Sequence, residues 1–154
     1  MNVFIIYDSK YGNTKFAAEK ILEGIKSSRT FEAATGCIKD VALQELANYD
    51  CIVFGAPNHM GAPSRAMKKF VNRLPDYTPK VKFVAVFGTY SGRERTVDRA
   101  VKKLEQLVKK NLPNAKMISS SLSIRVNGIP GPIVSEELPK CVDFGKKITT
   151  QLTA

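Results

Sequence analysis

The chain has no tryptophan, one histidine and three cysteines among its 154 residues, and these shortages exclude several kinds of site. The cysteines, Cys37, Cys51 and Cys141, are odd in number and widely spaced, without a Cys-x-x-Cys pair or a neighbouring histidine. A disulfide framework needs paired cysteines, and a structural zinc site needs closely spaced Cys and His ligands. We therefore expect no bound metal and interpret the cysteines as buried, reduced thiols that act as small hydrophobic side chains.

Long hydrophobic segments are also missing. The chain begins MNVFIIYDSK, a short apolar run without the basic leader and the length of a signal peptide, and no segment approaches the roughly 20 apolar residues of a membrane span. With 44% apolar and 25% charged residues, the composition provides enough apolar material for a globular core. We expect a cytoplasmic protein without a membrane span, folded as a single domain over residues 1–154.

Acidic residues are scarce, because 14 Asp and Glu accompany 24 Lys and Arg and leave a net charge of +10. Such a balance is typical of proteins that bind nucleic acids, anionic membranes or acidic proteins. The basic residues are scattered along the chain in short groups, with neither a continuous basic tail nor interleaved aromatic residues, which nucleic-acid binders often have. We therefore expect no specific nucleic-acid partner.

The chain does contain a regular alternation of strand and helix patterns. Short apolar runs predict buried strands, and apolar residues at three- to four-residue spacing predict amphipathic helices. The predicted strands cover residues 3–7, about 31–38, 51–54, 81–87 and about 116–125. The predicted helices cover residues 14–26, 96–110 and about 134–151. A further helix is predicted with Pro63 in its first turn, and a short helical turn is predicted at about 42–47. The predicted loops include residues 55–62, 88–94 and 126–132. This alternation predicts an α/β fold, a doubly wound five-stranded parallel sheet with helices on both faces.

Ligands of such sheets bind beyond the carboxyl ends of the strands, so the loops after the first, third and fourth strands form the candidate site. The first loop, Asp8 to Thr14, offers hydroxyls, an amide and backbone N–H groups next to a helix N-terminus, which suits an anion. Gly12 lets the backbone curl, while Ser9 and Thr14 can donate hydrogen bonds from opposite ends. The loop matches neither the triphosphate nor the dinucleotide motif, which disfavours nucleotide hydrolysis. An ordinary helix cap is the alternative for the same residues.

The segment Tyr7-Asp8-Ser9-Lys10-Tyr11-Gly12-Asn13-Thr14 resembles the FMN-phosphate signature of flavodoxins, and residues 49–57 resemble their third-strand segment. The likeness extends over nearly the whole chain and implies strand order 2-1-3-4-5, with FMN at the switch point between the first and third strands. The chain is similar to short-chain flavodoxins and to the flavodoxin domains of flavodiiron proteins. The resemblance implies that FMN binds to Ser9, Lys10, Tyr11, Gly12, Asn13, Thr14, Pro57, Asn58, His59, Met60, Gly61, Thr89, Tyr90, Ser91 and Gly92.

By the same resemblance, the second loop lies against the flavin ring, and its Met60-Gly61 peptide turns a carbonyl toward the N5 edge of the reduced flavin. Glycine has no Cβ, so that peptide reorients at low steric cost; a plain turn is the alternative. Tyr90 in the third loop is the expected stacking ring, with an ordinary surface tyrosine as the alternative. We expect His59 to pack beside the flavin or to face solvent. A role as proton donor is the alternative, which the absence of a neighbouring nucleophile or carboxylate disfavours.

The resemblance implies a monomeric electron carrier that shuttles low-potential electrons between redox proteins. This chain is basic where many flavodoxins are acidic, so we expect redox partners with acidic docking faces. Lys10, Arg93 and Arg95 near the proposed site predict a less negative potential for the second reduction step of the flavin. Two alternatives remain: an FMN-dependent NAD(P)H/quinone reductase, and an interaction module that has the fold without the flavin.

Overall fold

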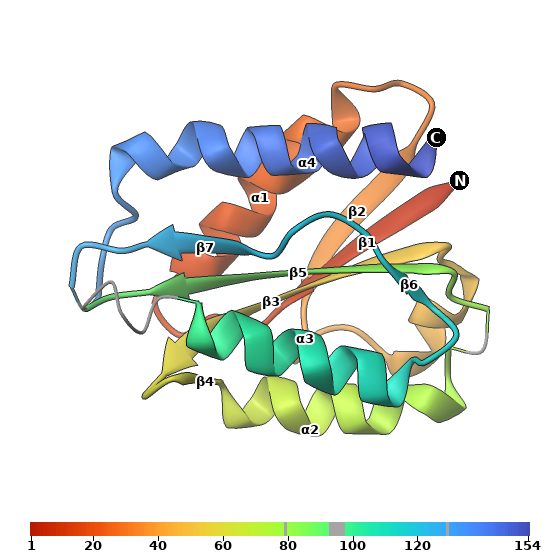
Figure 1. Ribbon diagram of the computed structural model, residues 1–154, viewed down its shortest axis with the longest axis horizontal. Helices are drawn as coiled ribbons and strands as arrows, with labels where there is room; N and C mark the ends of the chain where they lie inside the picture. The colour runs from red at the N-terminus through yellow and green to blue at the C-terminus, as the bar shows by residue number, and fades with distance from the viewer. Residues whose placement is uncertain (79, 93–97, 129) are drawn as a thin grey trace.

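The computed structural model describes every residue except 79, 93–97 and 129. The strands are β1 (Asn2–Tyr7), β2 (Glu32–Cys37), β3 (Cys51–His59), β4 (Ala62–Pro63), β5 (Phe83–Tyr90), β6 (Lys116–Met117) and β7 (Leu122–Arg125). The helices are α1 (Asn13–Lys26), α2 (Arg65–Arg73), α3 (Arg99–Asn111) and α4 (Leu138–Leu152), with 3-10 turns at Leu43–Asn48, Leu74–Asp76 and Ser135–Glu137. Helices α1 and α4 cover one face of the sheet and α2 and α3 the other (Figure 1).

The predicted α/β class is confirmed, and the sheet differs from the prediction in detail. Within the described residues it has seven strands in the order β2-β1-β3-β5-β6, with β4 paired to β3 and β7 paired to β5. All pairs are parallel except β3 with β4. The extra strands arise because a short hairpin follows β3 and because the predicted fifth strand is divided into β6 and β7.

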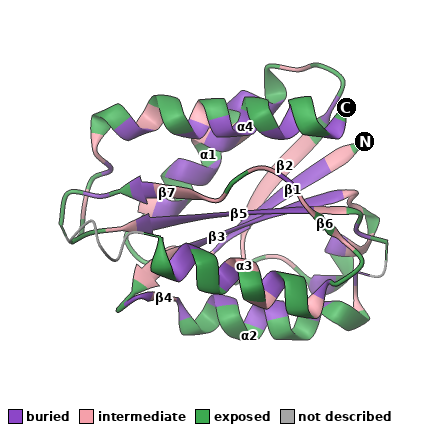
Figure 2. Cartoon of the chain, in the orientation of Figure 1, coloured by how far each residue is buried: buried purple, intermediate pink, exposed green. Residues whose placement is uncertain are grey.

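The sheet is buried on both faces because alternate residues of its central strands enter different cores. In β1, Val3 and Ile5 belong to the core under α1 and α4, while Phe4 and Ile6 belong to the core under α2 and α3. Each such buried side chain contributes roughly 1.5–3 kcal/mol relative to exposure. The helices present their exposed residues to solvent on the outer sides of both layers (Figure 2).

Strands β3 and β5 extend further than the sequence predicts, so the predicted loops 55–62 and 88–94 are wrong at their beginnings. Gly55, Ala56 and Pro57 stay in parallel register with Phe87, Gly88 and Thr89. Proline tolerates this position near the end of a strand, and neighbouring strands override the weak strand propensity of glycine. The extension carries the candidate site residues on paired strands instead of free loops.

The position predicted for Pro63 is also corrected, since Pro63 pairs with Asn58 in the β3–β4 hairpin instead of opening a helix. Ser64 caps α2, because its Oγ accepts the N–H of Met67 at 3.3 Å. Serine at this position satisfies an N–H group that the first turn leaves without a partner. Helix α3 begins at Arg99. The sequence predicts its start at residue 96, and residues 96 and 97 lie outside the described residues.

The predicted strand 116–125 is interrupted near Ser119, whose φ of 63° is left-handed. The Ser119 N–H donates to Oε1 of Gln151 in α4 at 2.6 Å, so a helix side chain replaces a strand partner there. Both β6 and β7 nevertheless pair with the same strand, β5. The break therefore leaves the end of β7 aligned with the end of β5.

The cysteines are free thiols, of which Cys51 and Cys141 are buried and Cys37 is half-buried. Burial raises the pKa of Cys51 and of Cys141 to about 12. No helix in the described part of the chain is long and apolar enough to cross a membrane. Over the same residues, no cluster of three or more His, Cys, Asp or Glu could hold a metal ion.

Candidate functional site

A cleft lies at the carboxyl ends of β1, β3, β5 and β7. The cleft is lined by Ser9, Lys10, Tyr11, Asn13, Thr14, Pro57, Asn58, His59, Thr89, Tyr90, Ser91, Val126, Gly128 and Pro130. The structure thus brings together residues of all three predicted loops, and it adds the loop that follows β7.

The first loop converges its N–H groups on one point. Ser9 Oγ accepts the N–H of Gly12 at 3.1 Å and the N–H of Lys15 at 3.4 Å. Gly12 has a φ of 90°, a left-handed conformation that only glycine adopts without strain. Helix α1 starts directly after it with no acidic residue in its first turn. An oxygen of a bound anion can accept the same N–H groups, aided by the positive end of the helix dipole.

The first and third loops are joined beneath the cleft by two hydroxyl groups. Thr14 Oγ1 and Thr89 Oγ1 are hydrogen-bonded at 2.9 Å, and both residues are buried. A buried hydroxyl needs such a partner, because leaving it unsatisfied costs roughly 1–3 kcal/mol. The pair fixes the start of α1 against the end of β5.

A fourth loop, between β7 and α4, also borders the cleft, although it is not among the loops predicted for the site. The Asn13 side-chain amide donates to the carbonyl oxygen of Pro130 at 2.7 Å. Val126 pairs with Ile133, which closes the loop at its base. The available signal was position: this Gly- and Pro-rich loop follows the fifth strand at the same edge of the sheet as the other three.

The second loop is a tight hairpin turn at the edge of the cleft. Met60 and Gly61 occupy the turn with φ values of 54° and 82°, and Asn58 Oδ1 accepts the Gly61 N–H at 2.7 Å. Pro57, Asn58 and His59 line the cleft, whereas Met60 and Gly61 do not. Gly61 is buried and Met60 is 103% exposed, so the methionine projects into solvent.

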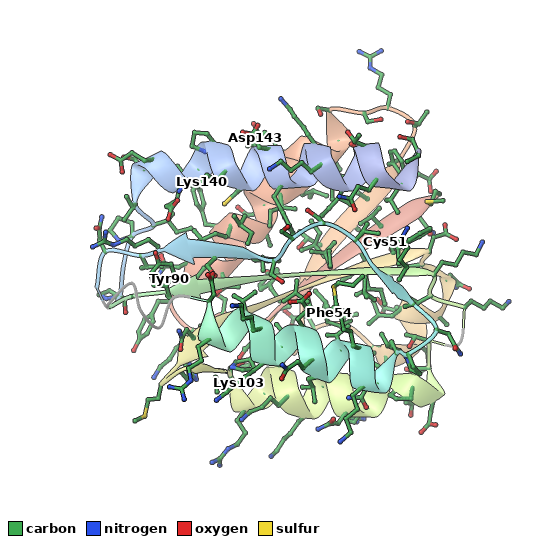
Figure 3. The ribbon with its side chains drawn as sticks, viewed as in Figure 1. Cys51, Phe54, Tyr90, Lys103, Lys140 and Asp143 are labelled. Carbon is green, nitrogen blue, oxygen red and sulfur yellow. The ribbon has the colours of Figure 1, made fainter. Side chains whose placement is uncertain are left out.

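The third loop contributes Thr89, Tyr90 and Ser91 to the cleft, while Gly92 lies outside it. Tyr90 is half-buried at the end of β5, at the same end of the molecule as Lys140 of α4 (Figure 3). Arg93 and Arg95, which are predicted to make the second reduction potential of the flavin less negative, lie outside the described residues.

A cation–π contact lies in the first loop, and a buried carboxylate lies behind the fourth. Lys10 lies over the Tyr11 ring, with Nζ 5.3 Å from the ring centroid. Behind the fourth loop, Glu137 is buried and its Oε1 accepts the N–H of Arg125 at 3.0 Å. Its Oε2 lies 2.7 Å from Lys140 Nζ, and hydrogen bonding to Glu137 raises the pKa of Lys140. The Glu137 carboxylate therefore fixes the end of β7, where the fourth loop begins.

The first loop, the hairpin after β3 and Tyr90 at the end of β5 lie at the carboxyl edge of one doubly wound sheet, the position at which sheets of the flavodoxin kind bind FMN. The sequence profile described as a flavodoxin domain matches residues 4–119. The chain therefore belongs to the flavodoxin family, whose cofactor is FMN.

Individual relatives support the same assignment. The chain is 33% identical over 89 residues to a flavodoxin of Clostridium saccharobutylicum, a match that covers 58% of this chain and 56% of that protein. It is 34% identical over 68 residues to a flavodoxin of Aquifex aeolicus strain VF5, which covers 44% of this chain and 37% of that protein. The matches thus span about half or less of the length of these relatives.

Solved structures agree in fold. A flavodoxin from the domain Archaea superposes with a TM-score of 0.83 at 24% identity, covering 100% of both chains. The Flv1 flavodiiron core from Synechocystis sp. PCC6803 gives a TM-score of 0.78 at 19% identity, covering 99% of this chain and 36% of that chain. At these identities the likeness establishes the fold alone.

Proposed function

We propose that this chain binds FMN noncovalently in the cleft and carries low-potential electrons between redox proteins, as a cytoplasmic, single-domain monomer. The observation that carries the proposal is the Ser9–Thr14 loop, whose N–H groups converge at the start of α1 beside a cleft bordered by aromatic and small residues. When bound, FMN supplies electron storage in one- or two-electron steps. The protein supplies binding, orientation and charge.

The first loop binds the phosphate. The N–H groups of Gly12 and Lys15 already point to one acceptor, Ser9 Oγ, and a phosphate oxygen can take its place while the Ser9 hydroxyl turns to donate. Asn13 and Thr14 complete the loop, and their side chains are held by Pro130 and Thr89. Hydrogen bonds to a charged group contribute roughly 1.5–3 kcal/mol each.

The remaining site residues hold the ring. Pro57, Asn58 and His59 line the cleft from the end of β3, and Tyr90 and Ser91 line it from the end of β5. Tyr90 is the aromatic residue that we assign to stacking. The Met60-Gly61 peptide can present either its N–H side or its carbonyl side, because Gly61 lacks a Cβ. In the described conformation the Gly61 N–H is held by Asn58 Oδ1.

The proposed partners are redox proteins with acidic docking faces. The chain carries a net charge of +10, and complementary charge accelerates encounter more than it adds affinity. The rate of electron exchange with an acidic partner should therefore fall as salt is raised.

Titration of FMN and of riboflavin into the purified protein, followed by flavin fluorescence, tests the site. FMN should bind far more tightly than riboflavin, which lacks the phosphate. Ser9→Ala should weaken FMN binding roughly 10- to 100-fold, from the loss of one charge-assisted hydrogen bond, and leave riboflavin binding unchanged. Ser135→Ala, an exposed serine away from the cleft, is the matched control.

Stepwise anaerobic reduction of the FMN-loaded protein tests the carrier role. A long-wavelength absorbance band that rises and then falls indicates two separate one-electron steps, as a carrier requires. Direct bleaching, together with oxidation of NAD(P)H by a quinone in the presence of this protein alone, would replace the carrier with a reductase. Failure to take up FMN would leave an interaction module without flavin.

A further inference from the structure

The basic residues gather on one layer of the fold, although they are scattered along the sequence. Helix α2 carries four basic residues and no acidic one, and α3 carries five basic residues and one acidic one. All nine basic side chains are exposed: Arg65, Lys68, Lys69, Arg73, Arg99, Lys102, Lys103, Lys109 and Lys110. We call this surface the basic face; Lys103 is labelled on it in Figure 3.

The opposite layer carries a smaller excess of positive charge. Helices α1 and α4 together carry six basic and three acidic residues. On α1, Lys20 pairs with Glu23 at 3.1 Å. The charge asymmetry of the chain therefore lies between the two faces of the sheet, and most of the net charge belongs to α2 and α3.

Helix stability accounts for the basic residues in the last turns, Arg73, Lys109 and Lys110, but not for those in the first turns. Basic residues in the first turns of α2 and α3 oppose the positive ends of the helix dipoles, and neither first turn has an acidic residue. Like charges three or four residues apart destabilise a helix. Arg65 has this spacing to Lys68 and Lys69 in α2. Arg99 has the same spacing to Lys102 and Lys103 in α3. Within the described residues, Lys109 alone among the nine forms an ion pair, with Glu105 at 3.6 Å.

The basic face reaches the edge of the flavin cleft. Both helices begin at the carboxyl edge of the sheet, where α2 follows the β3–β4 hairpin directly (Figure 1). The Arg99 side chain lies against the hairpin turn, because its Cδ is 3.0 Å from the position that a Cβ on Gly61 would occupy. Met60, whose side chain is fully exposed, is the other residue of this turn.

We propose that an acidic redox protein docks on the first turns of α2 and α3 and over Met60, with its own redox centre toward the flavin cleft. This inference rests on the proposed function and names the surface that the partner uses. Met60 provides an adaptable apolar contact at the centre, and Lys68, Lys102 and their neighbours provide the surrounding charge. In the productive complex one electron leaves the reduced flavin and reduces the partner's centre.

An acidic protein fits this face better than a membrane or a nucleic acid. Among the described residues, the large exposed apolar side chains are Met1, Tyr11, Phe16 and Met60, none of which lies on α2 or α3. Insertion into lipid requires apolar residues on the binding face, and single-stranded nucleic acid is bound by stacking on aromatic residues. Charge around one apolar contact beside a redox site is instead the pattern of a protein interface.

Three charge-reversal pairs, each with the same change in net charge, test the position of the docking surface. The near pair is Lys68→Glu with Lys102→Glu, in the first turns. The far pair is Arg73→Glu with Lys110→Glu, at the other ends of the same helices. The opposite pair is Lys146→Glu with Lys147→Glu, both exposed on α4. None of the six residues lines the cleft, so FMN affinity serves as the check on folding and on the proposed function.

The probe is cytochrome b5, a small haem protein with an acidic surface. The FMN-loaded protein is reduced anaerobically with dithionite, and stopped-flow mixing follows reduction of ferric to ferrous haem by one electron at several salt concentrations. The near pair should slow this step about tenfold at low salt and flatten its salt dependence, while the far and opposite pairs change it less than about threefold.

Equal effects of all three pairs would overturn the inference, because net charge alone would then control the rate. Tight binding of duplex DNA or of anionic phosphatidylserine vesicles, weakened equally by the near and far pairs, would also overturn it in favour of a polyanion along the whole face. Loss of FMN binding in the unchanged protein would instead defeat the proposed function, which the titration detects separately.

Discussion

Replacing Gly24 by alanine should destabilise this protein, although the same change in an ordinary helix interior stabilises by about 1 kcal/mol. Gly24 of α1 and Gly145 of α4 face each other where the two helices cross. A Cβ on Gly24 would overlap the Val142 carbonyl oxygen and lie 3.1 Å from the Gly145 Cα, and a Cβ on Gly145 would overlap the Ile21 carbonyl oxygen. These neighbours are backbone atoms, which cannot rotate away.

The expected magnitude follows from two opposing terms. Overpacking typically costs 1–3 kcal/mol, and the upper end of about 3 kcal/mol applies here because the whole helix must move. Subtracting about 1 kcal/mol of gained helix propensity leaves a net loss of about 2 kcal/mol for Gly24→Ala. For a chain of this size, that loss lowers Tm by about 4–8 °C.

Urea unfolding followed by circular dichroism measures the change in the free energy of unfolding. Gln106→Ala, at an exposed position of α3, should stay within about 0.5 kcal/mol of the parent. Gly24→Ala combined with Gly145→Ala should cost less than the sum of the single changes, because the first separates the helices for the second. A Gly24→Ala protein as stable as its parent would refute the close crossing.

Three further outcomes are expected. Gly12→Ala should cost roughly 1–2 kcal/mol from its φ of 90° alone, since a Cβ there meets nothing within 4 Å; thermal unfolding measures it. Thr14→Val should lower stability by roughly 1–3 kcal/mol, because it leaves the buried Thr89 hydroxyl without its partner, whereas an unchanged urea midpoint would contradict that pairing. Burial raises the pKa of Cys51 and Cys141 to about 12 from 9.0, so a thiol reagent at about pH 8 should label Cys37 alone in the folded protein. Because the unfolded chain releases those two protons at lower pH, the free energy of unfolding should fall as pH rises from about 9 to about 12.

The fold could be predicted from the sequence because its periodic signals are strong. The apolar run Val3–Tyr7 and the three- to four-residue spacing in α1, α3 and α4 each permit one interpretation. The ends of β3 and β5 could not be predicted from local signals. Gly55, Pro57 and Gly88 are typical of loops, yet they lie in strands. Partner strands, on both sides of Gly55 and Gly88 and on one side of Pro57, hold them there, and no local pattern reveals those partners.

The site was predictable where a motif has its own chemistry, as in the Ser9–Thr14 loop. The fourth loop was missed because its contribution depends on a long-range contact, Asn13 with Pro130, which no spacing encodes. The basic face was missed for a different reason. Its residues are separated in sequence, yet the parallel strand order already places α2 beside α3, so charge counted by helix would have indicated it.

The Met60-Gly61 turn combines two costs that the fold itself does not require. Two-residue hairpins with left-handed φ at both positions favour Asn-Gly, and a methionine at φ 54° costs roughly 1–2 kcal/mol instead. The Met60 side chain is also fully exposed, so it gains nothing from burial in the free chain. A partner that covers Met60 offsets both costs, since burying a methionine contributes roughly 1.5–3 kcal/mol. The residue least favourable for the hairpin is therefore also the one most open to contact, in a turn whose other residue, Gly61, lies against Arg99 of the basic face.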